Sequence, residues 1–285
     1  MGPPLPPDKV EFPRIPTEKP DAPGGKRRPA RLACAYTAAM PTPASPATDT
    51  VRPCPLCAAT DTVPWHRDAR RDYHRCAVCA LVFVPREQHL APAAEAAVYA
   101  HHDNRLDDPG YRRFLARLAT PVLAGLPALR ERLGLDAQAP LAGIDIGCGP
   151  APLLAQMLGE QGVRMAVWDP LYATDRAPLA QRYHLVTASE VVEHFREPAA
   201  GFAQLFALLR PGGLLAVMTK RTRDRDAFAR WHYIQDPTHI AFYGEQTFGW
   251  LAAHYGASLA MPGDDVVVFQ LPAGENAAMP EHHRS

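Results

Sequence analysis

The amino-acid sequence predicts an α/β fold built on a mostly parallel sheet, with a small cysteine-containing unit in front of it. Beyond residue 140, short apolar segments of strand length alternate with amphipathic segments of helix length. This alternation is typical of parallel strands whose two faces are covered by helices. The last two apolar segments flank the turn "PGDD" at 262–265 and predict an antiparallel hairpin at the sheet edge. Two Cys-x-x-Cys pairs, at 54–57 and 76–79, predict the separate unit.

Composition places the chain among ordinary globular proteins. Of its 285 residues, 47% are apolar, and 30 basic residues balance 30 acidic ones. No overall field therefore draws the chain to nucleic acid or to a membrane. Its apolar runs are far shorter than a membrane span, and its first residues do not resemble a signal peptide. We therefore expect a cytoplasmic protein with no membrane contact, whereas the oligomeric state is not predicted.

Changes in composition along the chain predict five segments. They are a disordered leader at 1–50, the cysteine unit at 51–90, a helical linker or cap at 91–140, the main domain at 141–272 and a flexible tail at 273–285. The leader carries twelve prolines and few large apolar residues, so it cannot bury enough surface to offset the entropy of ordering. Met40 lies within it and is an alternative start position.

The elements of the main domain follow in a regular order. A helix is expected from Asp108, an N-cap residue, with Pro109 in its first turn. The elements expected after it are a strand at 141–146, a helix at 152–162, a strand at 163–169, a strand at 184–189, a helix at 198–209, a turn at 210–213, a strand at 214–220, a helix at 247–256, and paired segments at 257–261 and 266–271. Only 14 residues separate Asp169 from the strand near His184. A further strand usual at that place is therefore shortened or absent.

A loop after the first strand of this domain has the features of a nucleoside-binding turn. In "IDIGCGPAP", at 144–152, the strand runs into Asp145 and is followed by Gly147 and Gly149. Asp169 comes 24 residues after Asp145, about where an acidic side chain binds ribose hydroxyls in dinucleotide-binding folds. The loop is therefore a candidate nucleoside site.

Three carboxylates near the loop support a ligand site. Two prolines in the loop limit which kind of ligand can bind there. Asp145, Asp169 and Glu190 all end predicted strands, so they meet on the rim where open parallel sheets bind ligands. Each acid alone is also explained as the end of a strand or the cap of a helix. Pro150 and Pro152 remove two backbone N–H groups that a pyrophosphate would need. The loop thus favours S-adenosylmethionine, which has ribose hydroxyls but no phosphate.

The loop resembles the first motif of class I S-adenosylmethionine-dependent methyltransferases. The family pattern acid-x-Gly-x-Gly-x-Gly becomes Asp145, Gly147, Gly149 and Ala151 in this sequence. Ala151 departs from the pattern, since a methyl group reduces the freedom of close backbone approach.

Two further stretches carry the same resemblance. They are "EVVEHF" at 190–195 and "LLRPGGLLAV" at 208–217, and with the loop they cover roughly residues 110–271. The domain is similar to UbiG/UbiE-like methyltransferase domains. The resemblance implies a Rossmann-like, seven-stranded and mostly parallel methyltransferase sheet.

The resemblance also implies roles for individual residues. The residues implied to bind the cofactor are Asp145, Gly147, Cys148, Gly149, Asp169 and Glu190. Glu190 and His194 lie four residues apart, on one face if a helix has begun there, and the resemblance places them near the sulfonium group and the substrate entrance. A structural hydrogen bond that shapes the rim is the alternative role of His194.

The cysteine unit is a candidate zinc ribbon. Cys54, Cys57, Cys76 and Cys79 form two Cys-x-x-Cys pairs separated by 18 residues, a spacing typical of tetrahedral structural zinc. Four thiolates leave no position for water, so this metal is expected to be structural rather than catalytic. A redox dithiol is the alternative, but it explains only one pair at a time.

A zinc ribbon before a methyltransferase domain resembles two groups of enzymes. One acts on small molecules or sugar-linked metabolites, and the other methylates ribosomal RNA and uses its ribbon to grip RNA. The stretch "HRDARRDYHR" at 66–75 is only slightly positive, because aspartates interrupt its arginines. A phosphate-binding surface would be more basic. We therefore interpret this stretch as a solvated ribbon loop, and nucleic acid is not the favoured partner.

The segment at 223–243 is expected to cover the acceptor. It contains His232, Asp236 and His239, and its "DPTH" element resembles one found in small-molecule methyltransferases. We expect His239 or His232 to position or deprotonate the acceptor, with Asp236 orienting one imidazole. Local capping by Asp236 and metal binding by all three side chains are the alternatives. The catalytic candidates, with the one from "EVVEHF", are His239, His232, Asp236 and His194.

These features together predict an enzyme. It would transfer a methyl group from S-adenosylmethionine to an O or N atom of a small-molecule acceptor, with a structural Zn²⁺ in its ribbon. An RNA methyltransferase that grips RNA with the ribbon is the first alternative, and a non-catalytic scaffold that binds protein through the ribbon is the second.

Overall fold

The computed structural model describes residues 52–100 and 104–274. The predicted leader, Met40 and nearly all of the predicted tail lie outside the described residues. In the described part, no helix is long and apolar enough to cross a membrane.

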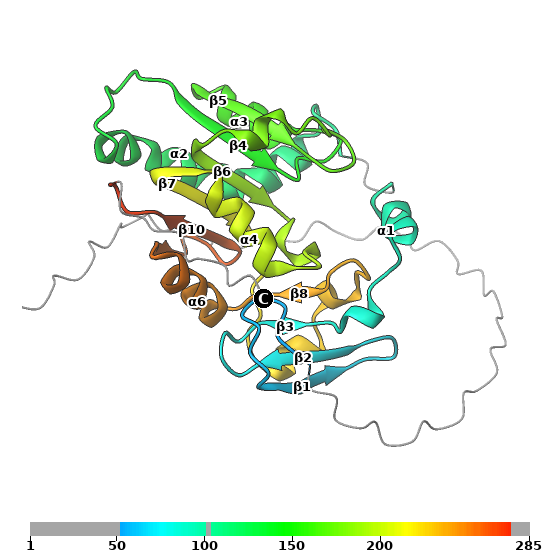
Figure 1. Ribbon diagram of the computed structural model, residues 1–285. Coiled ribbons are helices and arrows are strands. Elements are labelled where there is room, and N and C mark those ends of the chain that lie inside the picture. Colours follow the sequence, from blue (N-terminus) through cyan, green and yellow to red (C-terminus); the bar gives the residue numbers. More distant parts are fainter. Residues whose placement is uncertain (1–51, 101–103, 275–285) are drawn as a thin grey trace, which may run out of the picture.

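A six-stranded sheet forms the centre of the fold (Figure 1). In spatial order its strands are β5 (Val163–Trp168), β4 (Leu141–Ile146), β6 (Tyr183–Ser189), β7 (Leu209–Met218), β10 (Val266–Gln270) and β9 (Ser258–Ala260). The first four run parallel, whereas β10 is antiparallel to β7 and to β9. The chain adds β5 on one side of β4 and then β6 on the other, so the strand order reverses at β4. The predicted α/β class, the parallel core and the terminal hairpin are confirmed.

The sheet differs from the expectation in two places. It contains six strands within the described residues rather than seven. After Asp169 the chain makes one isolated bridge, to Ala173, and a short 3-10 helix, η2 (Ala177–Ala180), because the segment before β6 is too short for another strand and its connection. The predicted turn at 210–213 instead lies inside β7, where it interrupts the pairing with β6.

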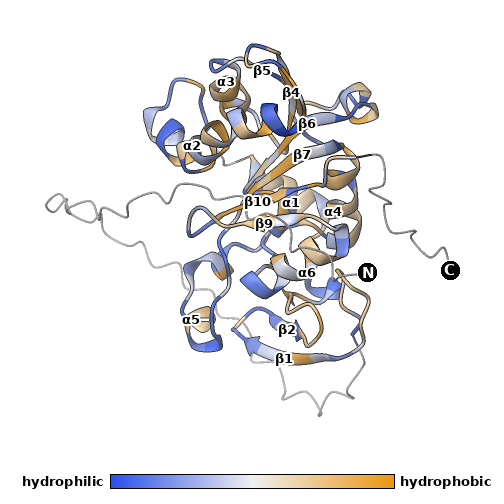
Figure 2. Ribbon diagram, turned by 90° about the vertical axis from the view of Figure 1, so that its left-hand side faces the viewer, coloured by the Kyte–Doolittle hydropathy of each residue, from blue (hydrophilic) through white to orange (hydrophobic). Residues whose placement is uncertain are grey.

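Helices cover both faces of the sheet, and each face has its own apolar core. One face packs against α2 (Pro109–Arg132) and α3 (Leu153–Gly159), and the other against α4 (Pro198–Ala207) and α6 (Glu245–Tyr255). Figure 2 shows the central strands as the most hydrophobic part of the ribbon, as expected for strands buried on both sides. Helix α2 begins as predicted, since the Asp108 side chain accepts a hydrogen bond from the Gly110 backbone N–H.

The cysteine unit shares a second sheet with a distant part of the chain. This four-stranded sheet has the order β1 (Thr62–Arg67), β2 (Asp72–Cys76), β3 (Val82–Phe83) and β8 (Ala241–Phe242). Strand β8 comes from the segment that was expected to cover the acceptor, and it lies beside β3 in Figure 1. Hydrophobic periodicity cannot reveal a two-residue strand of this kind, so the sequence did not predict the connection.

Short helices complete the described chain. They are η1 (Arg86–Gln88), α1 (Pro92–Tyr99), η3 (Val192–His194), α5 (Arg225–Ala229) and η4 (His232–Gln235).

Candidate active site

The glycine loop joins β4 to α3 and depends on backbone conformations that favour glycine. Gly147 has φ +70° and Gly149 has φ +63°. A Cβ atom on Gly147 would lie 2.5 Å from Val191 Cγ2, whereas one on Gly149 would meet nothing within 4 Å. Gly147 therefore allows the loop to pass close to the segment that follows β6.

Asp169 organises this loop from the end of β5. Its Oδ2 accepts a hydrogen bond of 2.9 Å from the Gly149 N–H, and its Oδ1 accepts bonds of 2.8 and 3.0 Å from the N–H groups of Leu171 and Tyr172. The Gly147 N–H donates to the Trp168 carbonyl. The two glycine N–H groups are thus engaged within the protein, which further disfavours a pyrophosphate at this loop.

Asp145 lies beneath the loop and is only 3% exposed. The Thr187 hydroxyl donates a hydrogen bond of 2.6 Å to its Oδ1. Burial raises the pKa of Asp145 to about 7, and repulsion from Asp169 acts in the same direction. A cationic ligand beside this carboxyl would favour its ionised form.

A cavity of about 880 Å³ connects the loop to the predicted acceptor residues. Eight of the predicted site residues line it, from four parts of the chain: Gly147, Cys148, Gly149, Asp169, Glu190, His194, Asp236 and His239. Asp145 is not among the lining residues. Ser189 Oγ and Trp168 Nε1 also belong to lining residues, are buried, and have no hydrogen-bond partner among the described residues. His232 lies elsewhere: it is exposed, and its Nε2 is 2.9 Å from Lys220 Nζ.

The "EVVEHF" motif forms a tight turn at the end of β6 rather than an α-helix. Glu190 has a left-handed backbone with φ +51°, and residues Val192–His194 form η3. A non-glycine residue at such a φ is uncommon and often marks a functional site. The turn still brings Glu190 and His194 to the same cavity, as expected from a helical face.

Glu193 is a site residue that the sequence analysis missed. It is fully buried, and it accepts a short hydrogen bond from the Tyr233 hydroxyl, which also lies 3.3 Å from Glu190 Oε2. Burial raises the pKa of both carboxyls, and for Glu190 repulsion from Glu193 adds to this effect. The signal in the sequence was a second acid in the "EVVEHF" motif, three residues after Glu190 and next to His194.

Two histidines meet at the far end of the cavity. The ring centroids of His194 and His239 are 4.8 Å apart. His194 Nδ1 lies 3.1 Å from the Thr238 carbonyl, and His239 Nδ1 lies 2.8 Å from the Tyr233 carbonyl. Burial lowers the pKa of both imidazoles, that of His239 to about 4, so both are neutral near pH 7. Asp236 Oδ2 lies 3.8 Å from His239 Nε2.

The comparison with known families decides the class of protein. The methyltransferase domain family matches residues 111–260, more than half of the 285 residues. The chain belongs to this family. The match confirms the predicted methyltransferase domain, but it does not identify the acceptor.

Several solved structures are similar to this chain over part of its length. An O-methyltransferase family protein from Burkholderia thailandensis has 14% sequence identity and a TM-score of 0.41, and the match covers 64% of each chain. The 1,6-didemethyltoxoflavin-N1-methyltransferase from the same organism, solved with 1,6-didemethyltoxoflavin and S-adenosylhomocysteine, has 20% identity and a TM-score of 0.39, covering 73% of this chain and 99% of that one. The match spans only 58% of the length of the CurJ carbon methyltransferase. No curated protein matches the chain.

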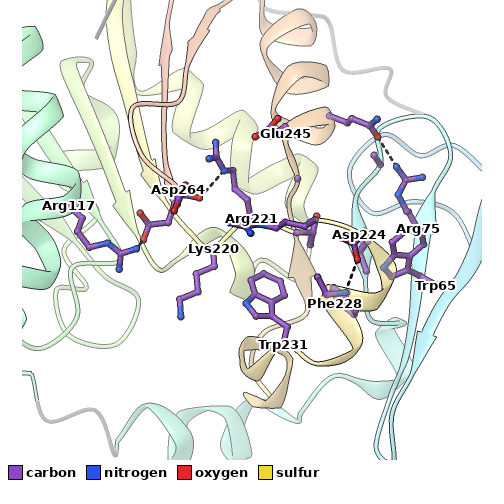
Figure 3. A pocket seen from close by; sticks show the side chains of 18 residues that line it. Trp65, Arg75, Arg117, Lys220, Arg221, Asp224, Phe228, Trp231, Glu245 and Asp264 are labelled. Carbon is purple, nitrogen blue, oxygen red and sulfur yellow. Dashed lines mark hydrogen bonds and ion pairs between the residues drawn. The ribbon is translucent and has the colours of Figure 1, made fainter. Parts of the chain in front are cut away.

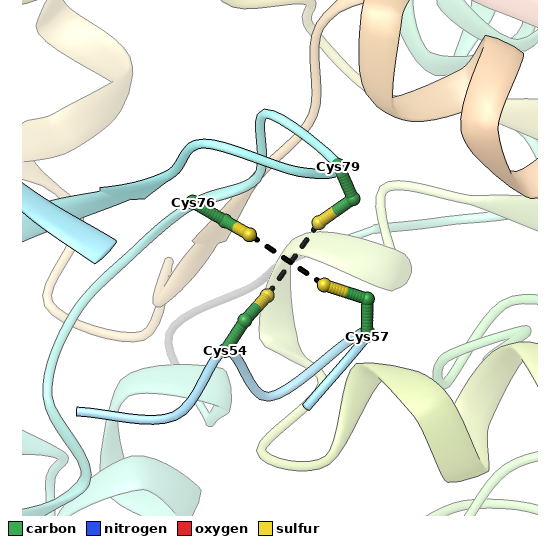
Figure 4. A group of neighbouring side chains, drawn as sticks. All are labelled: Cys54, Cys57, Cys76 and Cys79. Atoms are coloured by element: carbon green, nitrogen blue, oxygen red, sulfur yellow. Dashed lines mark hydrogen bonds between the residues drawn. The ribbon is translucent and has the colours of Figure 1, made fainter. Parts of the chain in front are cut away.

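The four predicted zinc ligands lie together at the edge of the ribbon. Figure 4 shows their sulfur atoms turned toward one centre, with Cys54 Sγ and Cys79 Sγ 3.5 Å apart and Cys57 Sγ and Cys76 Sγ 3.5 Å apart. Each of the four ligand atoms lies within 4.8 Å of the others. Separations of this size agree with four thiolates around one ion at about 2.3 Å.

A second cavity, of about 940 Å³, lies between the ribbon and the end of β7 (Figure 3). Trp65 and Arg75 of the ribbon line one side of it, and Lys220 and Arg221 line the other. The Arg221 guanidinium is turned toward Asp264, whose carbonyl it contacts at 2.9 Å. The cysteine unit therefore lies near the carboxyl end of β7, next to the segment that carries the candidate acceptor residues.

Arg71 joins the ribbon to that segment and is itself only 6% exposed. Its guanidinium donates hydrogen bonds to four backbone carbonyls, those of Ile234, Asp236, Pro237 and His239, at 2.6 to 3.1 Å. The interpretation of residues 66–75 as a solvated loop is therefore wrong: Arg71 and Tyr73 are buried, and most of the stretch belongs to β1 and β2. A guanidinium can satisfy several converging carbonyls, which a lysine ammonium cannot do in the same geometry.

We expect Arg71→Lys to loosen the segment that holds His239. A buried carbonyl that loses its hydrogen-bond donor destabilises the folded segment by about 1–3 kcal/mol. Backbone amides at 234–240 should exchange hydrogen at least about tenfold faster, which corresponds to 1.4 kcal/mol. Hydrogen exchange with mass spectrometry measures this directly.

Arg70→Lys is the matched control, since Arg70 is exposed and makes one bond of 3.0 Å to the Gln235 carbonyl. It should leave the exchange unchanged. If the backbone amides of residues 234–240 exchange hydrogen equally slowly in Arg71→Lys and Arg70→Lys, Arg71 does not hold the segment.

Proposed function

We propose that this protein transfers a methyl group from S-adenosylmethionine to an O or N atom of a small-molecule acceptor, a metabolite or a sugar-linked compound. One observation supports this most: a single cavity of about 880 Å³ joins the glycine loop to two histidines and a carboxylate. A volume of this size is at the upper end of small-molecule sites and accommodates a cofactor beside an acceptor.

The residues at the loop end fit the proposed cofactor. The predicted set is Asp145, Gly147, Cys148, Gly149, Asp169 and Glu190. Asp169 supplies a carboxylate at the rim, Asp145 lies buried beneath the loop, and the glycines allow close backbone approach. The unpartnered Ser189 Oγ and Trp168 Nε1 are the polar atoms that a ligand would be expected to satisfy. When bound, S-adenosylmethionine supplies the methyl group, whose bond to sulfur breaks with its electron pair remaining on the sulfur.

The residues at the other end are proposed to hold the acceptor. Of the two predicted bases, His239 lines the cavity and His232 does not, so we assign the acceptor to His239, with His194 beside it. The Asp236 carboxylate lies next to His239 Nε2. We propose that it takes up the proton that the acceptor loses during methyl transfer. Holding the acceptor atom in line with the methyl group contributes more than any proton transfer, about 7–11 kcal/mol in well-oriented systems.

The zinc ribbon is proposed to be structural. Cys54, Cys57, Cys76 and Cys79 would bind one Zn²⁺ with no open position. The UbiG/UbiE-like subtype and a cytoplasmic location remain parts of this proposal.

The RNA alternative has less support than the small-molecule acceptor. Of the arginines in 66–75, Arg71 is buried and binds carbonyls, while the exposed Arg67 pairs with Asp72 and Arg75 donates to Gln246, which reduces the positive charge open to phosphate. An RNA clamp would need a more basic and less paired surface.

The proposal is tested with the full-length protein in three steps. Calorimetry should show S-adenosylmethionine binding, whereas a non-catalytic scaffold need not bind it. Incubation with methyl-labelled cofactor and separate pools of metabolites and RNA should then place the label in the low-mass fraction. Label in the RNA fraction would favour the RNA alternative, and binding without transfer to either pool would contradict the proposal. Elevated salt that leaves transfer unchanged would further exclude RNA binding.

A further inference from the structure

Glu193, His194 and His239 form a compact group of potential metal ligands at the histidine end of the cavity. One ligand atom from each lies within 4.8 Å of the other two. The group is separate from the four cysteines, and it differs from the set His232, Asp236 and His239 considered from the sequence. Strand β6 leads into the first two residues, and the third comes from the segment held by Arg71.

The hydrogen bonds of the two histidines fix which nitrogen is free. A carbonyl oxygen can only accept, so the contacts of His194 Nδ1 with Thr238 and of His239 Nδ1 with Tyr233 require a proton on each Nδ1. In the neutral ring, Nε2 then carries an unshared electron pair. Metal-binding histidines usually have their second nitrogen held in this way by a carbonyl or carboxylate.

Glu193 presents the third ligand atom. The Tyr233 hydroxyl donates to its Oε1, whereas its Oε2 is buried and has no hydrogen-bond partner among the described residues. A buried carboxylate oxygen without a partner is costly, so the site requires either a proton or a cation there. Two imidazole nitrogens lie close to this oxygen. A metal cation therefore fits the site better than a proton, because the carboxylate and both imidazoles can bind one cation together.

We propose that Glu193, His194 and His239 bind a divalent transition-metal ion, Zn²⁺ or a neighbouring first-row cation. Two imidazoles and one carboxylate are a ligand set for such ions rather than for Mg²⁺ or Ca²⁺, which prefer oxygen ligands. Three protein ligands leave a coordination position open, as in catalytic rather than structural sites. Both histidines line the cavity, so the open position is accessible to a small molecule.

The role of this ion rests on the proposed methyl transfer, although its binding does not. An acceptor hydroxyl bound at the open position would have its pKa lowered by the ion, which favours oxygen over nitrogen as the acceptor atom. Asp236, whose Oδ1 accepts hydrogen bonds from Thr238 and whose Oδ2 lies 3.8 Å from His239 Nε2, would receive the released proton.

Cobalt distinguishes this site from the zinc ribbon by spectroscopy. Cells grown with Co²⁺ in place of Zn²⁺ should yield a full-length protein with about two cobalt ions per chain, one for each ligand set. Cobalt bound by the four thiolates gives intense near-ultraviolet charge-transfer bands, whereas cobalt bound by imidazole and carboxylate gives only weaker visible bands. Glu193→Gln and His239→Ala should each lose about one cobalt ion and retain the charge-transfer bands, which also report that the ribbon remains folded.

His232→Ala is the control, since this exposed histidine lies in the same segment but outside the cavity. It should retain both ions. A wild-type protein with a single cobalt ion, all of whose absorbance is of the thiolate type, would overturn the proposal. Failure of methyl transfer with two ions bound would instead contradict the proposed function and leave the metal site intact.

Discussion

Replacement of Cys76 by serine is expected to destabilise the whole protein and not only the ribbon. Cys54, Cys76 and Cys79 belong to the same buried core as Phe202 and Val217 on one face of the main sheet. Loss of a metal is among the few changes that cost more than about 4 kcal/mol. For a chain of this size that corresponds to a fall in Tm of about 8–16 °C.

Thermal unfolding followed by circular dichroism, with zinc content measured on the same samples, tests this expectation. Cys76→Ser should lose the zinc ion of the four-cysteine site, about one ion per chain, and unfold at the lower temperature. Cys148→Ser is the matched control, because Cys148 is also buried but lies in the glycine loop, away from the cluster. It should retain both zinc and Tm. A Cys76→Ser protein that has lost this one zinc ion and keeps an unchanged Tm would show that the ion does not support the shared core.

Local patterns in the sequence predicted most of the main domain. The strands at 141–146 and 163–169 and the terminal hairpin appear at or near the expected residues, because each is a short apolar run between turn residues. The Asp108 cap and Pro109 likewise identify the start of α2. Such signals lie within a few residues of one another, which is why they can be recognised without the fold.

Long-range pairing was beyond the sequence. The two residues of β8 join a sheet whose other strands lie more than 150 positions earlier, and Arg71 binds carbonyls as far away as His239. Glu193 was missed for a related reason: its burial and its contact with Tyr233 arise only when two distant segments meet. The sequence identified the histidines by their chemistry, whereas the structure shows which of them lie together.

The strongest effect on cofactor binding is expected from Gly147→Ala. The left-handed backbone at this position costs a non-glycine residue about 1–2 kcal/mol. In addition, the new methyl group would lie 2.5 Å from Val191 Cγ2 and 3.1 Å from Val191 Cγ1, so either the loop or Val191 must move. The free protein then holds its loop in another conformation, and ligand binding has to restore the original one. We expect the affinity for S-adenosylmethionine, measured by calorimetry, to fall at least about 100-fold, or 2.7 kcal/mol.

Two comparisons separate the steric effect from the backbone effect. Gly149→Ala has nearly the same φ, but its methyl group meets nothing within 4 Å, so it should lose only about 5- to 30-fold in affinity. In Gly147→Ala combined with Val191→Ala, the closest remaining contact is with the Cβ at 3.4 Å, an ordinary van der Waals distance. The double variant should therefore recover affinity toward the level of Gly149→Ala, a coupling that a double-mutant cycle measures.

Equal losses of S-adenosylmethionine affinity in Gly147→Ala and in the double variant would mean that the close approach to Val191 does not determine the loop conformation. Retention of full affinity in all of these variants would place the cofactor elsewhere, because this turn is the part of the rim where glycine is required by both conformation and space.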